Sequence, residues 1–70
     1  MVDVTAATDG TVGAIRVEAG ETVEKEETLV ILVARDKEIL IKAPEGGTVR
    51  KIPCEEGTAV QEGDVLVVLD

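Results

Sequence analysis

Few side chains in this 70-residue chain could take part in chemistry. It has no histidine, the commonest general base and metal ligand, and a single cysteine, Cys54. Acidic pairs at residues 26–27 and 55–56 have the composition of an acid–base pair, but no polarising partner stands beside them, so we interpret them as solvated loop charges. The remaining candidate is a run of four charged residues, 35–38, which lies between two aliphatic stretches.

Composition and charge narrow the class of protein. The chain carries 15 acidic and 7 basic side chains, a formal charge of −8. Because phosphate binding requires clustered lysine and arginine, nucleic acid is a poor partner, whereas an acidic surface suits basic clefts on other proteins. A lone cysteine forms no internal disulfide, and the first residues hold neither a basic stretch nor a long apolar run. We therefore expect a cytoplasmic domain that does not enter a membrane.

The chain repeats itself. Residues 4–33 align without a gap on residues 41–70, at an offset of 37, and eleven of the thirty pairs are identical. Each half is too short to bury its own apolar face, so the repeat predicts two halves packed about a pseudo-two-fold axis. Two copies are too few for a solenoid, which favours a closed barrel or sandwich. Cys54 aligns with Val17, so we interpret it as a small apolar residue rather than a redox thiol.

Strand signals agree between the two halves. Each half has a strand after a glycine, a short strand between two turns, and a final aliphatic strand. The predicted long strands are residues 11–17 and 29–33 in the first half and 48–54 and 65–69 in the second. In both halves the parity of the apolar residues reverses within the first of these strands, which predicts a bulge at 13–14 and at 50–51. The sequence therefore predicts one all-β domain over residues 1–70, a flattened eight-stranded barrel or sandwich.

Residues 34–40 join the halves and have no twin in the repeat. The stretch 33–41 is composed of a strand, a charged tip at 35–37 and a second strand, which predicts a hairpin. A symmetric sandwich places this tip at one end of the molecule and the chain termini at the other. Because rigid strands can present a functional group at such a tip, we expect the functional residues here, at Arg35, Asp36 and Lys37.

The repeat, the hairpin and two further stretches resemble the biotinyl/lipoyl attachment domains. The two stretches are residues 41–49 (IKAPEGGTV) and 60–66 (VQEGDVL), and the resemblance covers essentially the whole chain. It implies a compact barrel that carries biotin, or alternatively lipoate, on a hairpin lysine and swings this arm between the active sites of a multienzyme complex. It also implies a non-catalytic domain, monomeric in isolation, whose partners are a biotin or lipoate ligase and carboxylase or acyltransferase subunits.

The hairpin departs from this family at its tip. Biotin carriers read Ala-Met-Lys-Met there, and the gapless alignment places Asp36 at the modified lysine, with Lys37 one residue later. Two registers are open. With residues 35–36 at the apex, Lys37 shares the parity of Ile39 and leans toward the core. With residues 36–37 at the apex, an ion pair and two apolar pairs form across the strands, and this pairing chemistry favours Lys37 at the tip.

Two classes of function remain as hypotheses. In the first, the domain is a carrier and Lys37 is the residue to which biotin or lipoate is attached. In the second, the chain is an unmodified scaffold or interaction module that kept the fold after losing the attachment lysine and binds no cofactor. A further alternative is a carrier whose tip was altered by design. Exposure of Lys37 in the hairpin is the property on which the first hypothesis depends.

Overall fold

The computed structural model describes residues 1–70, which form strands and turns. The strands are β1 (Val2–Thr5), β2 (Gly10–Ile15), β3 (Thr22–Val23), β4 (Thr28–Ala34), β5 (Lys37–Lys42), β6 (Gly47–Lys51), β7 (Ala59–Val60) and β8 (Val65–Leu69). The chain contains no helix with the length and apolar character needed to cross a bilayer.

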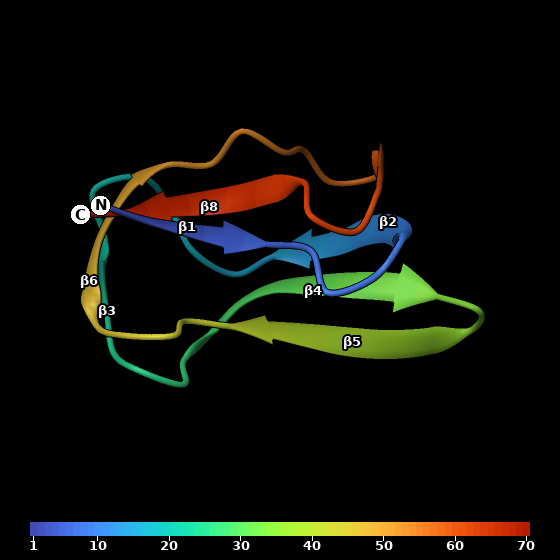
Figure 1. The fold of residues 1–70 in the computed structure, drawn as a ribbon, viewed down its shortest axis with the longest axis horizontal. Helices are drawn as coiled ribbons and strands as arrows, with labels where there is room; N and C mark the ends of the chain where they lie inside the picture. Colours follow the sequence, from blue (N-terminus) through green and yellow to red (C-terminus); the bar gives the residue numbers. More distant parts are fainter.

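The strands form two four-stranded antiparallel sheets that lie on opposite sides of the core (Figure 1). Their strand orders are β1-β8-β6-β3 and β5-β4-β2-β7. Exchanging each strand for the one four places away in the chain converts the first order into the second. The pseudo-two-fold axis inferred from the repeat therefore exchanges the two sheets, and the predicted all-β architecture is confirmed.

Backbone hydrogen bonds outside the strand ladders repeat with the same offset of 37 residues. The Ala43 N–H donates to the Glu27 carbonyl oxygen at 2.9 Å, and its equivalent, Ala6, donates to the Asp64 carbonyl oxygen at 2.9 Å. These bonds attach the segment after each edge strand, β1 or β5, to the turn that precedes β8 or β4. Equivalent turns are thus held to equivalent strand ends in both halves.

Both predicted bulges are present. The register shifts between Val12 and Ala14, where β2 pairs with β4, and between Val49 and Lys51, where β6 pairs with β8. A bulge adds one residue to a strand and so restores the inward direction of the apolar residues that follow it. The parity reversal seen in both halves of the sequence therefore has one physical cause.

The bulged strands end earlier than the sequence predicted. We expected them to reach residues 17 and 54, but β2 ends at Ile15 and β6 at Lys51. One further bond continues the pairing of β2, from the Arg16 N–H to the Leu29 carbonyl oxygen at 2.8 Å. In the second half Pro53 occupies the position of Arg16 and has no N–H to donate, so β6 stops short of it.

The core is entirely aliphatic. All 16 buried residues are apolar, and 15 of them form one cluster between the sheets. Leu29 and Leu32 from β4 and their equivalents Leu66 and Leu69 from β8 are its largest members, each at most 1% exposed. Burying one leucine stabilises a fold by about 1.5–3 kcal/mol relative to leaving it exposed. The two halves thus contribute equivalent side chains to one shared core.

The glycines that open β2 and β6 are required by close backbone approach. A Cβ atom on Gly10 would lie 2.9 Å from the Val33 carbonyl oxygen, and one on Gly47 would lie 2.5 Å from the Asp70 carbonyl oxygen. Both distances are too short for a real side chain. Val33 and Asp70 are themselves equivalent, so the repeated glycine reflects one contact made twice.

At one turn the two halves share the backbone conformation but differ in the residue that adopts it. Gly63, between β7 and β8, has a φ of 93°, and its equivalent before β4 is Glu26, with a φ of 73°. This left-handed conformation suits glycine but strains a residue with a Cβ atom. The backbone bonding is nevertheless preserved, because the Glu26 N–H donates to Ala43 at 2.9 Å as the Gly63 N–H donates to Ala6 at 3.0 Å.

We therefore predict that Glu26→Gly raises the free energy of unfolding by about 0.5–1 kcal/mol, the relief of left-handed strain minus the extra entropy that glycine gains on unfolding. Urea denaturation followed by far-UV circular dichroism measures it, since the chain has no tryptophan. Glu26→Ala removes the same carboxylate but keeps a Cβ atom, and should give no such gain. Equal stabilisation by both variants would show that charge, not backbone strain, is responsible.

Candidate functional site

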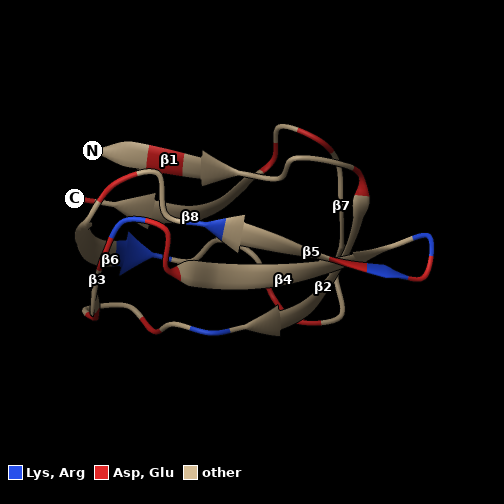
Figure 2. Ribbon diagram, turned by 90° about the horizontal axis from the view of Figure 1, so that it is seen from below, with Lys and Arg blue, Asp and Glu red and all other residues tan.

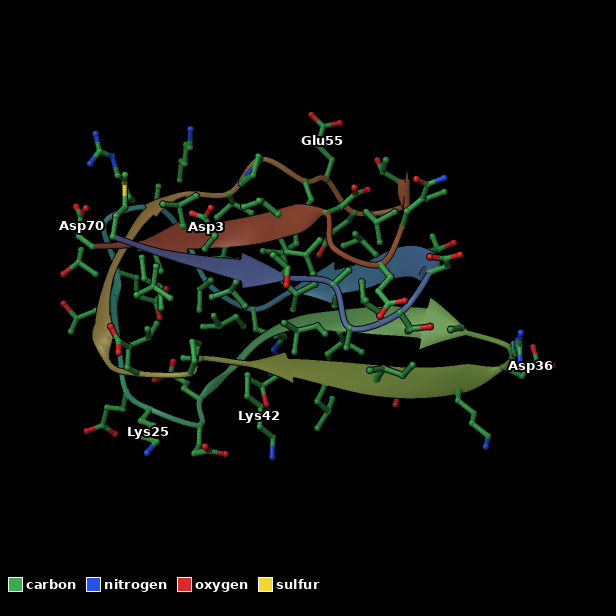
Figure 3. The ribbon with its side chains drawn as sticks, in the orientation of Figure 1. Asp3, Lys25, Asp36, Lys42, Glu55 and Asp70 are labelled. Atoms are coloured by element: carbon green, nitrogen blue, oxygen red, sulfur yellow. The ribbon has the colours of Figure 1, made fainter.

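The β4–β5 hairpin forms one end of the molecule. It extends beyond the other strands, and both chain termini lie at the opposite end, as predicted (Figure 1). Figure 3 shows Asp36 at the outer end of this hairpin and Asp70 at the other end of the domain. Four consecutive charged residues alternate in sign around the tip: Arg35, Asp36, Lys37 and Glu38 (Figure 2). All four are exposed.

A two-residue turn connects the strands of this hairpin. Arg35 and Asp36 occupy its apex, with φ values of 52° and 65°. Positive φ at both central residues defines the type I′ turn, whose twist matches that of the flanking strands. The residues on either side, Ala34 and Lys37, form the first cross-strand pair. The turn therefore places Asp36 at the apex and Lys37 at the start of β5.

Of the two registers that the sequence left open, the one with residues 36–37 at the apex is wrong. Cross-strand pairing chemistry favoured it, but the hairpin is also held at its far end. The Ala43 N–H bonds to Glu27, and the pairing of Lys42 with Thr28 continues from there. One register shift lies between Thr28 and Val30. From the Val30–Ile41 pair onward the strands pair residue by residue up to Ala34 and Lys37, which leaves residues 35–36 for the turn. Tertiary anchoring therefore overrides the local pairs.

Lys37 is exposed in this register, although it has the parity of the inward-facing residues of β5. It lies beyond the end of the core, where its inward neighbour Ile39 is only half-buried. The single ion pair of the structure joins Arg50 and Asp70, at 3.3 Å, and no hydrogen bond involves the Lys37 side chain. The Lys37 amine is therefore free, although Lys37 lies on the inward-facing side of β5, as this register predicts.

A shallow hollow of about 370 Å³ lies beside Lys37. The hairpin contributes one wall, and the loop between β1 and β2 and the turn between β7 and β8 contribute the other. The lining residues are Thr8, Asp9, Ala34, Arg35, Lys37, Ile39 and Glu62. The lining thus combines two carboxylates, two cationic side chains and two apolar residues, so the hollow could receive a flexible arm with both apolar and polar groups.

The second wall is held by the two backbone hydrogen bonds of Ala6, with Gly63 and Asp64, and by one bond to a side chain. The Glu62 N–H donates to the Asp9 carboxylate at 2.7 Å, which joins the β1–β2 loop to the β7–β8 turn. Sequence reasoning did not include Asp9, Thr8 or Glu62 among the site residues. Their distance along the chain from the hairpin gave no direct signal, and only the closure of the sandwich brings them to its tip.

Cys54 takes the structural role predicted for it. It packs half-buried against the core cluster, and its thiol donates to the Leu66 carbonyl oxygen at 3.4 Å. Burial raises the pKa of this thiol above its ordinary value, although a hydrogen bond with the backbone of Cys54 itself acts in the opposite direction. A raised pKa keeps the thiol neutral and weakly nucleophilic at neutral pH.

Comparison with known proteins identifies the family to which this geometry belongs. A family model described as biotin-requiring enzyme, for the biotin/lipoyl domain, matches residues 3–69. The chain belongs to the biotin/lipoyl attachment domain family. A biotin/lipoyl attachment protein of Bacillus subtilis is 38% identical to it over 60 residues, which cover 86% of this chain and 82% of that protein. The expected resemblance is therefore confirmed, and the family is one of carrier domains.

Other relatives in this family are parts of much longer chains. The acetyltransferase component of the Staphylococcus aureus pyruvate dehydrogenase complex is 42% identical over 55 residues, which cover 77% of this chain and 13% of that protein. The Kluyveromyces lactis urea carboxylase structure superposes with a TM-score of 0.93 at 25% identity, covering 99% of this chain and 6% of that one. The lipoyl domain of the Azotobacter vinelandii 2-oxoglutarate dehydrogenase complex gives 0.76 at 28% identity, covering 90% and 80%. Members thus occur in both carboxylases and acyltransferase complexes.

The tip is where this biotin/lipoyl domain differs from the pattern of its family. The position that the gapless alignment gives to the modified lysine is Asp36, the second apex residue. The only lysine of the tip, Lys37, follows it and lies at the rim of the hollow. An attachment site in this chain would therefore lie one residue beyond the apex.

We predict that Asp9→Ala loosens the wall opposite Lys37, because the Glu62 N–H loses its carboxylate partner. The expected cost is about 0.5–1.5 kcal/mol, the net value of a typical hydrogen bond. Amide hydrogen exchange, read by NMR, should accelerate at Glu62 while exchange in β4 and β8 stays slow. Asp9→Asn is the matched control, since its amide oxygen still accepts the bond. Unchanged exchange at Glu62 in Asp9→Ala would contradict this role for Asp9.

Proposed function

We propose that this domain is a carrier in which biotin, or alternatively lipoate, is attached through an amide bond to the side chain of Lys37. The observation that carries the proposal is the exposed, unpaired Lys37 amine at the free end of the β4–β5 hairpin. The family supports it, since its members are carrier domains. The hairpin is also the part of the domain farthest from the termini, so an arm attached there can extend away from the rest of the domain (Figure 1).

The residues at the tip fit such an arm. Acylation would form a bond between the Lys37 Nζ and the carboxyl carbon of the arm, release the group that activates that carboxyl, and pass a proton from nitrogen to solvent. The hollow beside Lys37 offers Ile39 for apolar contact, while Arg35 and Asp9 offer polar groups to the arm. When bound, biotin would carry a carboxyl group, and lipoate an acyl group.

This domain would contribute no bond-making residue of its own. Its role would be to hold the arm on a rigid hairpin, so that the reactive end samples a partner's active site at a high effective concentration. Carboxylase or acyltransferase subunits are the expected partners, because relatives of this chain are parts of such proteins. A biotin or lipoate ligase would load it. The lone unpaired cysteine supports a reducing compartment such as the cytoplasm.

A specific observation favours the alternative of an unmodified interaction module. Asp36 occupies the apex position to which the alignment assigns the attachment lysine, and the Lys37 side chain starts from the strand rather than from the turn. An enzyme that recognises a lysine at the second apex position would find a carboxylate there. The two functions therefore differ in one measurable property, acylation of the tip.

The test is intact-mass spectrometry after co-expression with biotin ligase and, separately, with lipoate ligase. For a carrier we expect the wild-type chain to gain one biotinyl or lipoyl group, and Lys37→Arg to gain none, although its other lysines, Lys25, Lys42 and Lys51, are retained.

The double variant Asp36→Lys with Lys37→Arg moves the amine to the apex and serves as the matched control. If this variant is modified while the wild-type chain is not, the chain is an unmodified module. Absence of modification in the wild-type chain with either ligase contradicts the carrier function.

A further inference from the structure

The longest free sheet edge of this domain is β5. Each sheet has two edge strands, and β3 and β7 contain two residues each, β1 four and β5 six. β5 pairs with β4 alone, and none of the backbone hydrogen bonds outside the ladders involves one of its residues. A long unpaired edge is a template for pairing with another strand unless something blocks it.

Three residues of β5 present their backbone groups to solvent. Lys37 follows the two-residue turn, so its backbone groups bond to β4. In an antiparallel pair every second residue bonds to the neighbouring strand in this way. The N–H and C=O groups of Glu38, Leu40 and Lys42 therefore point away from β4. The side chains of the same three residues lie on the outer face, where all are exposed, and Leu40 is 50% exposed.

We propose that β5 is a self-complementary edge through which two copies of this domain associate as an antiparallel dimer. The outward residues of β5 follow the order Glu38, Leu40, Lys42. When Leu40 lies opposite Leu40 of the second copy, the partner strand runs in the opposite direction and presents the same residues in reverse order. Each Glu38 then lies opposite a Lys42, so one register forms two ion pairs and one apolar pair. In the same register, all three residues with outward backbone groups face their counterparts.

Charge and parity select this register. A shift of one residue sets the free backbone groups of one copy against groups already bonded to β4 in the other. A shift of two places Leu40 opposite a charged residue. A shift of four places Glu38 opposite Glu38, or Lys42 opposite Lys42, and like charges directly opposite are destabilising.

The equivalent edge in the other half lacks this property. In β1 the residue equivalent to Leu40 is Asp3, so self-pairing of β1 in the same way would set two carboxylates side by side. β5 has no proline, and its inward-facing middle residues, Ile39 and Ile41, are apolar. Charged residues on an edge also oppose pairing, but in this register those of β5 lie opposite residues of the other sign. The pseudo-two-fold repeat thus contains one edge that repels a copy of itself and one that accepts it.

The distribution of charge agrees with a second copy as the occupant. The stretch 35–42 holds three basic and two acidic residues, a local charge of +1, although the whole chain carries −8. Two copies would therefore meet at a part of the surface that is less acidic than the chain as a whole. The interface is small, so the dimer is weak, and salt that screens the overall repulsion favours it. Such an association would differ from the monomer that the family resemblance implies, and it does not depend on modification of Lys37.

The experiment uses the unmodified full chain, with sedimentation equilibrium and NMR spectra recorded up to millimolar concentration at physiological ionic strength. We expect a monomer–dimer equilibrium, with concentration-dependent amide shifts concentrated at residues 38–42. Glu38→Lys replaces both ion pairs by like-charge pairs and should raise the dissociation constant about tenfold. The double variant Glu38→Lys with Lys42→Glu reverses the order and should restore the wild-type value.

Two further samples make the test specific. Glu38→Lys mixed with Lys42→Glu should form a heterodimer more readily than either variant associates with itself. Glu55→Lys makes the same change in net charge on the side of the domain away from β5, and should not weaken association (Figure 3). A chain that stays monomeric throughout, or a dimer that is as stable in Glu38→Lys as in the wild type, would overturn the proposal.

Discussion

The domain depends on the mutual burial of two aliphatic faces. Each sheet contains strands from both halves of the chain, so its inner face combines equivalent leucines and valines from the two halves, and it has nothing else to cover it. Without aromatic rings, the burial comes from many branched side chains, each of which stabilises the fold by about 1.5–3 kcal/mol when fully covered. The two sheets must therefore face each other across the pseudo-two-fold axis, and the bulges in β2 and β6 keep the apolar residues directed at that shared core.

This constraint also determines where the two halves are allowed to differ. Inward positions are apolar in both halves, whereas outward positions vary: Leu40 is equivalent to Asp3 and Val33 to Asp70. Both apolar members of these pairs are substantially exposed, on the outer face of the sheet that carries the hairpin. The fold is symmetric while its surface is not, and the apolar members of these two pairs lie on β4 and β5.

The conformation of the hairpin tip is fixed by the strands that lead to it. Arg35 and Asp36 both adopt left-handed conformations, each of which costs a residue with a Cβ atom roughly 1–2 kcal/mol. The pairing of β4 with β5, anchored at Ala43, holds the turn in this conformation. Strain of this kind persists where the surrounding structure over-determines it, and it is common at sites that present a group to a partner. A rigid tip suits a carrier, because the arm moves and the domain that presents it does not.

The amino-acid sequence by itself determined the all-β fold, the two-fold repeat, both bulges and the position of the hairpin opposite the termini. These features follow from local patterns of apolar parity, glycine and turn residues, and these patterns occur in both halves of the chain. The register of the hairpin has no twin and could not be found in this way. Local pairing favoured residues 36–37 at the apex, but the bond between Ala43 and Glu27, which repeats the one between Ala6 and Asp64, moved the apex to residues 35–36. Likewise, Asp9 and Glu62 join the tip only because the sandwich closes. Contacts between distant segments decided these points, because local cross-strand pairs differ by only a few tenths of a kcal/mol and discriminate weakly between registers.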